Sequence, residues 1–332
     1  MSFNINDLVN PEALPDATAN VSLVQTHISY VIIADNYVYK IKKAVNFGFL
    51  DFSTLEKRKY YCRREIDLNR RLSDGLYVDV LPVYCDGNYC RIGEGNGEAI
   101  EYAVKMKRLP DDMLMKSLFE KGLLTREHIL KISGKIAQFH RDANYSSDIE
   151  RFGDPEMFRV NTDENFHQTE KYRDITIDKE DFERIRKWTD DFYRSNKNLF
   201  YERIKNNFIR DCHGDLHMEH ICLTESIPIF DCIEFNERFR YTDTLADIAF
   251  LLMDLEYRGG NEFAELLWQD YSRLTGAADM ISLLKFYKVY RAYVRGKVIS
   301  FQLDDENIDK YKKDEAEASA KRYFQLAGKY VQ

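Results

Sequence analysis

The first third of the chain alternates apolar and polar positions with a period of two, which is typical of β-strands. Runs rich in β-branched and aromatic residues predict strands at 21–25, 29–34, 37–41, 77–84, 89–92 and 99–106. Turns are predicted at Asp35-Asn36, at Asp86-Gly87-Asn88 and at residues 93–97. One helix interrupts the strands, because Ser53-x-x-Glu56 is a predicted capping box and the apolar spacing continues to Leu72. This part is therefore predicted to be a small antiparallel sheet with one helix.

Beyond Pro110 the apolar positions recur every three to four residues, as in amphipathic helices. Helices are predicted at 111–121, 125–143, 179–203, 243–256, 261–274, 280–302 and 304–330, with a short strand pair at 221–223 and 227–233. The sequence therefore predicts an α+β protein of two lobes. The N-terminal lobe is expected at residues 1–107 and a larger, mainly helical C-terminal lobe at 108–332. Clefts between domains commonly hold small-molecule sites.

The charge balance excludes nucleic acid as the principal partner. The 332 residues include Lys+Arg 48 and Asp+Glu 56, a net charge of −8, and basic residues are interspersed with acidic ones. The N-terminus lacks the pattern of a secretory signal, and no apolar run approaches the roughly 20 residues that span a bilayer. We therefore expect a cytoplasmic protein without a membrane partner, and the sequence leaves its oligomeric state open.

Cysteine and glycine usage narrow the chemistry further. The six cysteines show no C-x-x-C spacing and mostly lie in apolar runs, so we expect buried free thiols. Glycine is scarce, and none precedes Gly48, which argues against a glycine-rich phosphate loop near the N-terminus. The run Gly93-x-Gly95-x-Gly97 lies between two predicted strands and opens no helix, so it is interpreted as a hairpin turn.

The densest group of reactive side chains lies at residues 210–223, between a predicted helix and an apolar strand. Two interpretations compete for it. His213, Asp215, His217 and His220 could ligate a transition metal, since imidazole suits Zn, Mn or Fe. Alternatively, the run matches the H-x-D-x-x-x-x-N loop of kinases, in which the Asp deprotonates an acceptor hydroxyl and the last position holds a metal ion.

The kinase interpretation needs a lysine on an upstream strand and a carboxylate on the following helix, and the sequence offers both. Strand alternation places Lys40 and Lys42 on the face opposite Tyr39. Glu65 falls on the apolar face of the predicted helix, and no cation lies three or four residues from it. An inward carboxylate needs a tertiary partner, and Lys40 is the natural candidate.

A kinase also needs a second acidic metal ligand beyond the loop. The apolar run 227–236 carries two acids, Asp231 and Glu234. Asp is the preferred residue type for this metal ligand, and Asp231 ends an apolar run. The spacing of Glu234 from Asp215 is closer to the spacing usual between the loop Asp and the second metal ligand in kinases. Both stay candidates.

Together these residues resemble a known family. His213-Gly214-Asp215-Leu216-His217, the acidic run and Asp247-Ile248-Ala249 are similar to the aminoglycoside phosphotransferase and choline kinase-like group of the protein-kinase-like fold. The chain also resembles an aminoglycoside phosphotransferase-like bacterial branch, on the runs 25–29, 39–43, 48–58 and 230–236. Members of that branch are often fused to a P-loop kinase domain, and no P-loop motif occurs in this sequence. The resemblance implies phosphoryl transfer from ATP or GTP to a hydroxyl of a small molecule.

The resemblance also implies roles for single residues. Asp215 and His213 would be the catalytic residues, with Asp215 as the base, and Glu65 would anchor Lys40 at the α- and β-phosphates. Further nucleotide contacts would come from the hinge at Met106, Lys107 and Leu109 and, in the absence of glycines, from Thr26 and Ser29. Mg²⁺ or Mn²⁺ would bind Asp231 or Glu234, and His220 occupies the metal-binding Asn position. Asp247 would brace the catalytic loop, and His140 would be structural.

Two other functions stay open. His220 and the missing glycines are compatible with a pseudokinase-like protein that binds nucleotide without transferring phosphate. Less favoured is a metal-dependent hydrolase built on the histidine cluster. The acceptor is also undefined. Asp243, Asp254 and Glu256 suit either a cationic acceptor or a solvated helix face, and Arg291 and Arg295 suit an anionic one.

Overall fold

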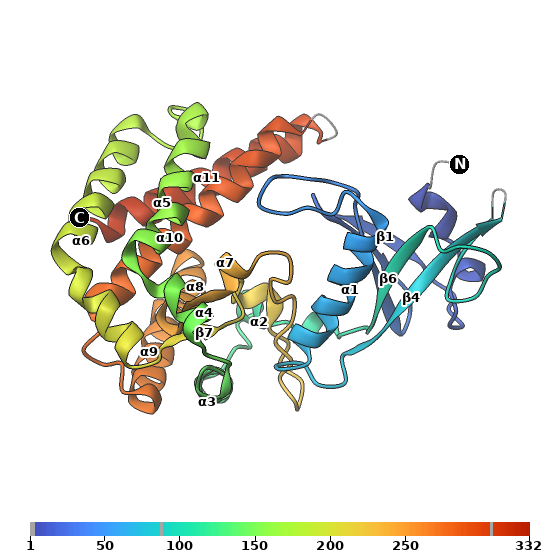
Figure 1. Ribbon diagram of the computed structural model, residues 1–332, viewed down its shortest axis with the longest axis horizontal. Coiled ribbons are helices and arrows are strands. Elements are labelled where there is room, and N and C mark those ends of the chain that lie inside the picture. Colours follow the sequence, from blue (N-terminus) through green and yellow to red (C-terminus); the bar gives the residue numbers. More distant parts are fainter. Residues whose placement is uncertain (1–3, 87–88, 306–307) are drawn as a thin grey trace. The chain divides into compact units, whose positions relative to one another are not determined.

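The computed structural model describes residues 4–86, 89–305 and 308–332, and the chain divides into two compact units (Figure 1). The first unit comprises Met1–Leu123 and Glu219–Glu237, and the second comprises Leu124–Met218 and Arg238–Gln332. This division differs from the expected boundary at residue 107. The helix α2 (Met115–Glu120) joins the first unit because Met115 N–H donates to the carbonyl of Ile221, and Leu223 N–H donates to that of Met113.

The first unit is built on a six-stranded antiparallel sheet with the order β1-β2-β3-β6-β4-β5. The strands are β1 (Ser22–Gln25), β2 (Ser29–Ile33), β3 (Tyr37–Lys42), β4 (Tyr77–Asp86), β5 (Tyr89–Ile92) and β6 (Glu101–Lys107). Every predicted strand of this region is confirmed, and so is the turn at Asp35-Asn36, where Ala34 N–H donates to the carbonyl of Tyr37. The connection at residues 93–97 is not a hairpin turn, because β6 pairs with β3 and β4 and not with β5.

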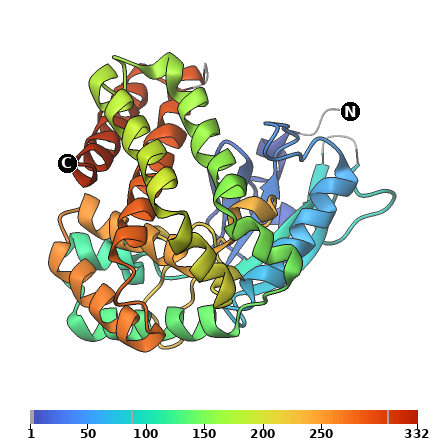
Figure 2. The same cartoon turned by 60° about the vertical axis from the view of Figure 1, so that its left-hand side comes forward.

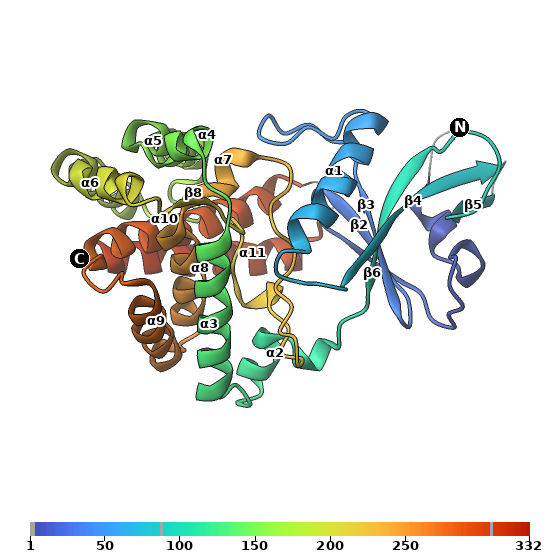
Figure 3. The same cartoon turned by 60° about the horizontal axis from the view of Figure 1, so that its bottom comes forward.

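The two faces of this sheet are covered by different segments. Tyr39 and Ile41 point into an apolar cluster with the N-terminal 3₁₀ turns η1 (Ile5–Leu8) and η2 (Pro11–Ala13). The opposite face carries Val104 and packs against the helix α1 (Leu55–Asn69), as Figure 3 shows. The alternation predicted for β3 is therefore confirmed. It directs Lys40 and Lys42 toward α1.

Two local predictions in this unit are corrected. The N-cap of α1 is Thr54, whose hydroxyl accepts from Lys57 N–H, while Ser53 donates its hydroxyl to Asp51. The helix also ends at Asn69 rather than at Leu72.

A disulfide corrects the expectation for the cysteines. Cys85 and Cys90 lie directly opposite each other on β4 and β5 and are joined by a disulfide. Antiparallel register brings their Cα atoms within 4.1 Å, and sequence spacing does not reveal this proximity. The other four cysteines, Cys62, Cys212, Cys222 and Cys232, are buried free thiols as predicted. The turn predicted at Asp86-Gly87-Asn88, between β4 and β5, includes residues 87–88, which lie outside the described residues.

The second unit is mainly helical (Figure 2). Its longer helices are α3 (Arg126–Asp142), α5 (Pro155–Thr169), α6 (Lys179–Lys205), α8 (Thr244–Tyr257), α9 (Asn261–Thr275), α10 (Ile281–Ser300) and α11 (Lys310–Tyr330), with one-turn helices α4 (Ser147–Glu150) and α7 (Glu237–Arg240). Phe166, Phe250, Tyr293 and Phe324 belong to its core. The helix α5 is absent from the sequence prediction, because its apolar positions are interrupted by Asn161, Thr162 and Asn165, which are buried polar residues.

A short two-stranded sheet, β7 (Ile209–Asp211) with β8 (Tyr241–Asp243), holds the segment before the histidine cluster and was not predicted. The strand pair predicted at 221–233 is reduced to one bridge between Ile221 and Ile229. Among the described residues, no helix combines the length and the apolar character needed to cross a membrane.

Candidate functional site

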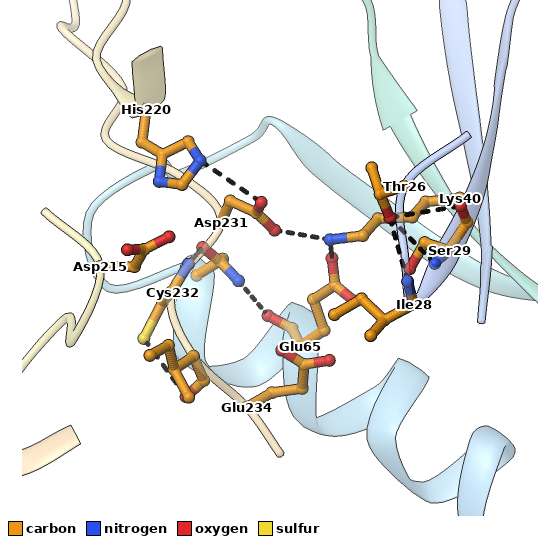
Figure 4. Close-up of polar contacts among 12 residues, drawn as sticks. Thr26, Ile28, Ser29, Lys40, Glu65, Asp215, His220, Asp231, Cys232 and Glu234 are labelled. Carbon is orange, nitrogen blue, oxygen red and sulfur yellow. Dashed lines mark hydrogen bonds and ion pairs between the residues drawn. The ribbon is translucent and has the colours of Figure 1, made fainter. Parts of the chain in front are cut away.

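The first unit holds one group of candidate residues, centred on an ion pair between β3 and α1. The ammonium of Lys40 lies 2.9 Å from Oε1 of Glu65, as Figure 4 shows. The expected pairing of these two residues is confirmed. Burial by itself raises the pKa of Glu65, but Lys40 and Lys42 outweigh it and lower that pKa, so the carboxylate stays ionised.

A second lysine also binds Glu65; strand alternation predicts its inward face but not its partners. Lys42 donates to Oε2 of Glu65 at 2.7 Å and also pairs with the carboxylate of Glu234. The side chains of Lys42 and Glu65 are 1% and 0% exposed. The signal for Lys42 was present in the sequence, since it shares the inward face with Lys40.

Asp231 is the most exposed residue of this set of ion pairs. Its Oδ1 lies 2.5 Å from Lys40 Nζ, and its side chain is 39% exposed, whereas that of Glu234 is 5% exposed. Burial would lower the pKa of Lys40, but the carboxylates of Asp231 and Glu65 raise it above its usual value. Of the two acidic candidates, Asp231 is the one whose carboxylate is accessible.

The backbone around Asp231 is fixed by contacts to the end of α1 and the start of β4. Asp231 N–H donates to the hydroxyl of Tyr77, and Cys232 N–H donates to Oδ1 of Asn69 at 2.8 Å. Asp231 has a φ of 62°, a left-handed conformation that Asp tolerates better than most residues. The predicted run of strand therefore ends in a turn that directs this carboxylate.

His220 lies beside Asp231 within the first unit. Its Nε2 is 3.5 Å from Oδ2 of Asp231, and its ring packs against Phe230. An imidazole next to a carboxylate is a donor pair that suits Mn²⁺ better than Mg²⁺, which prefers oxygen ligands alone. Oδ1 of Asp231 is taken by Lys40, so Oδ2 is the oxygen that faces His220, and the predicted metal-binding role of these two residues stays a prediction.

The turn at residues 26–29 is shaped by Thr26. Its hydroxyl accepts from the N–H groups of Ile28 and Ser29, at 3.3 Å and 3.0 Å. Ser29 is buried, and its hydroxyl has no hydrogen-bond partner among the described residues. The predicted phosphate-contacting role of Thr26 and Ser29 stays a prediction.

The predicted hinge overlaps the end of β6, because Met106 and Lys107 are its last two residues. Lys107 N–H donates to the carbonyl of Leu76, and Arg108 N–H donates to that of Asn36. Met106 and Leu109 pack, partly buried, against an apolar cluster that includes Tyr77 and Val104. Both backbone N–H groups, of Lys107 and Arg108, are therefore already hydrogen-bonded within the first unit. The predicted contact of Met106, Lys107 and Leu109 with the nucleotide base stays a prediction.

The second unit holds a separate group of candidate residues, on the loop that carries Asp215. Asp247, at the start of α8, accepts from His213 N–H at 3.0 Å and from Gly214 N–H at 2.8 Å. Burial tends to raise the pKa of Asp247, but a hydrogen bond from His140 and the nearby positive groups hold it at about 2. These contacts are the ones expected of a residue that braces the loop, and the structural role expected for His140 stays a prediction.

The side chains around Asp215 differ in what they can do. His213 is buried, and its Nδ1 accepts from Asp215 N–H, so this ring shapes the loop. The Asp215 carboxylate is 32% exposed and lies 3.5 Å from Nε2 of His217. The Asp215 side chain is thus partly exposed to solvent, on a loop whose backbone is held by Asp247.

Arg291 also braces this loop, which corrects its expected contact with an anionic acceptor. Its guanidinium donates to the carbonyl of Gly214 and to that of Ala246, both at 2.9 Å. Sequence pattern places Arg291 on a core-like helix but does not indicate a carbonyl as its partner.

The acidic residues considered for a cationic acceptor are also structural. Asp243 caps α8 and binds Arg203 through both oxygens. Asp254 is buried and accepts from Met218 N–H, and Glu256 pairs with Lys288. None of the three forms a solvated helix face or an open anionic patch.

At the level of sequence, this chain is similar to proteins of two mycobacteria. No family model matches the sequence. An uncharacterized protein of Mycobacterium tuberculosis and one of Mycobacterium bovis are each 30% identical over 313 residues, which is 94% of this chain. The chain spans 60% of the length of these curated relatives.

Among solved structures, an amicoumacin kinase in complex with AMP-PNP and Ca²⁺ matches with a TM-score of 0.54 and 13% identity, covering 95% of this chain and 89% of the kinase. A choline/ethanolamine kinase family protein from Mesorhizobium loti matches with a TM-score of 0.50 and 14% identity, covering 95% of this chain and 92% of that protein. A candidate aminoglycoside phosphotransferase from Ralstonia eutropha matches with a TM-score of 0.50 and 12% identity, covering 99% and 98%. This chain therefore has the protein-kinase-like fold of choline kinases and aminoglycoside phosphotransferases, as its sequence predicted.

Proposed function

We propose that this chain is a phosphotransferase that moves the γ-phosphoryl group of ATP to a hydroxyl of a small molecule. The observation that carries the proposal is the Lys40–Glu65 ion pair with the accessible Asp231 carboxylate beside it. The chain passes from the braced Asp215 loop directly into the Asp231 segment at Met218–Glu219.

The first unit supplies the nucleotide half of the reaction. Lys40 contacts the α- and β-phosphates, and Glu65 keeps its ammonium oriented. To do so, Lys40 exchanges its present partner Asp231 for phosphate oxygens. Asp231, with His220 beside it, holds the divalent cation. A bound Mg²⁺ or Mn²⁺ supplies charge neutralisation for the phosphate oxygens.

The apolar cluster at the end of β6 receives the adenine ring. Met106 and Leu109 contribute apolar surface. The base meets backbone groups of residues 106–109 other than the N–H groups of Lys107 and Arg108, which already donate within the first unit. At the turn of residues 26–29, Thr26 fixes the backbone from which phosphate contacts are made. GTP fits the same surface, so the choice of base is left to measurement.

The second unit supplies the proton transfer. Asp215 accepts the proton of the acceptor hydroxyl while the hydroxyl oxygen bonds to the γ-phosphorus. The bond from that phosphorus to the β–γ bridging oxygen breaks, and ADP leaves. Positioning provides most of the acceleration, because the base is held ready on a braced loop.

One observation favours a second candidate, a protein that binds nucleotide without transferring phosphate. The imidazole of His220 lies next to Asp231, where a kinase of this type carries an amide oxygen. Imidazole is a softer ligand than an amide oxygen and supports Mg²⁺ less well. Metal dependence separates the two candidates.

The test compares the wild-type protein with Asp215→Ala and with Asp279→Ala, an exposed acid on the same unit. ADP formation is measured over a panel of amines, amino sugars and alcohols, and nucleotide binding is measured by thermal shift with Mg²⁺ and with Mn²⁺. We expect Asp215→Ala to lose turnover at least 10²-fold and to keep nucleotide binding. Wild-type turnover in Asp215→Ala contradicts the proposal, and binding without turnover across the panel favours the second candidate.

A further inference from the structure

Lys40, Lys42, Glu65, Asp231 and Glu234 form one continuous set of ion pairs, and its charges do not cancel. Glu65 binds both lysines, Lys42 also binds Glu234, and Lys40 also binds Asp231. Two ammonium groups and three carboxylates leave a net charge of −1 when all are ionised. The positive charges of Lys40 and Lys42 balance the negative charges of Glu65 and Glu234. The surplus negative charge therefore falls on Asp231, the most exposed residue of the set.

We infer that Lys42 and Glu234 form a second, charge-balancing ion pair that positions Lys40 and Asp231 for nucleotide and metal. This inference rests on the proposed function. It assigns Lys42 and Glu234 as positioning residues that touch neither nucleotide nor metal.

Burial separates this pair from any ligand. The side chains of Lys42 and Glu234 are nearly inaccessible, and the ammonium of Lys42 also lies 4.9 Å from the ring centre of Phe52. Burial raises the pKa of Glu234, and the carboxylates of Glu234 and Glu65 raise that of Lys42. A buried carboxylate bound to an ammonium is poorly placed to ligate a metal ion.

The way Glu65 is shared explains how Lys42 acts on Lys40. Each oxygen of Glu65 serves one lysine, so Lys42 neutralises part of the charge that would otherwise hold Lys40. Without Lys42, two buried carboxylates act on the single ammonium of Lys40. Lys40 would then be held more tightly inside the network and would be less available to phosphate oxygens.

Glu234 acts on Asp231 through the chain. The two residues are three positions apart, and between them Cys232 N–H is fixed to Asn69. The ion pair to Lys42 therefore anchors the far side of the turn that holds Asp231 in its left-handed conformation. Loss of this anchor frees the carboxylate from its place beside Lys40.

The experiment makes the net charge of these five residues more negative in one variant and less negative in another, and restores it in the double variant. The variants are Lys42→Met, Glu234→Gln, the double variant Lys42→Met/Glu234→Gln and the conservative Lys42→Arg. The controls are Arg58→Met and Glu101→Gln, which break another buried ion pair between α1 and the sheet. For each protein we measure the melting temperature, the dissociation constant for ATP with Mn²⁺, the KM and kcat, and the metal concentration for half-maximal activity.

Lys42→Met makes the set more negative, so we expect at least 10-fold weaker ATP binding. Glu234→Gln makes the set neutral, so we expect a several-fold higher metal requirement with ATP binding unchanged or tighter. The double variant restores the net charge of −1 and is expected to recover most of the ATP affinity that Lys42→Met loses. Lys42→Arg is expected to stay within about threefold of wild type. All four variants are expected to lose melting temperature no more than the two controls do.

Variants of Lys42 and Glu234 that lose only melting temperature, with ATP and metal binding unchanged like the controls, overturn the inference. A double variant that is as weak as Lys42→Met also overturns it, because charge balance would then be irrelevant. The proposed function fails separately, when the wild-type protein itself binds no ATP in the presence of either metal.

Discussion

Asp247 accepts a hydrogen bond from the backbone N–H of Gly214 at 2.8 Å, and this contact fixes the residue next to Asp215. The other oxygen of Asp247 accepts from His213 N–H and lies 3.1 Å from Nε2 of His140. From the opposite side, Arg291 donates to the carbonyl of Gly214. The backbone next to Asp215 is thus held by residues of α8 and α10.

Replacement of Asp247 by Asn tests this bracing. The amide keeps one acceptor oxygen, but its NH₂ group would oppose one of the two backbone N–H donors. We expect kcat to fall about 10²-fold and the free energy of unfolding to fall by about 3 kcal/mol, because a buried charge pair is broken. ATP affinity is expected to stay unchanged. Steady-state kinetics, urea unfolding and calorimetry check this, with exposed Glu265→Gln as control, and an unchanged kcat would contradict the bracing role.

The pKa of Asp247 predicts a specific acid sensitivity. The folded value is about 2 and the usual value is 3.8, so the unfolded state binds more protons between these pH values. The ionised carboxylate therefore contributes about 2 kcal/mol above pH 4, and this contribution is lost as pH falls toward 2. Urea unfolding of wild type and Asp247→Asn between pH 2 and 6 measures the difference. We expect the difference in free energy of unfolding between wild type and Asp247→Asn to decrease as the pH falls. A constant difference would argue against an ionised Asp247.

Much of the first unit could be predicted from sequence, because strand alternation and helix spacing are local properties. The Lys40–Glu65 pair followed from the two inward faces and from the lack of a cation near Glu65 in its helix. The partners of Arg291 and Asp254 could not be predicted, since a backbone carbonyl or N–H leaves no trace in side-chain pattern. The same holds for the opposition of Cys85 and Cys90, which depends on strand register.

The disulfide between Cys85 and Cys90 is expected to stabilise the first unit. Closing so short a loop restricts the unfolded chain by about 2 kcal/mol. The double variant Cys85→Ser/Cys90→Ser should lose about this much in urea unfolding, and wild-type protein treated with dithiothreitol should lose the same amount. Dithiothreitol should not affect the variant. Equal stability of reduced and oxidised wild type would show that the bond contributes nothing.

Lys297 predicts a rise of stability with pH. Its ammonium donates to the amide oxygens of Asn165 and Gln168, and burial lowers its pKa to about 8. The usual value is 10.5, so between pH 8 and 10.5 the unfolded state binds more protons and stability increases by up to about 3 kcal/mol. Urea unfolding at pH 7.5 and 10 should show this increase in wild type and a smaller one in Lys297→Met. Tyrosine titration affects wild type and Lys297→Met alike. An equal increase of the free energy of unfolding in the two proteins would therefore contradict the lowered pKa of Lys297.

His220 predicts which metal supports the reaction. Its imidazole lies 3.5 Å from Asp231, the accessible carboxylate of the site. Imidazole favours Mn²⁺ over Mg²⁺, and an amide oxygen reverses this preference. We expect His220→Asn to raise turnover with Mg²⁺ relative to Mn²⁺ about 10-fold. His128→Asn, at the start of α3 and outside the site, is the matched control and should leave the ratio unchanged. A ratio equal in wild type and His220→Asn would mean that His220 does not take part in holding the metal, and the cation would then depend on carboxylates alone.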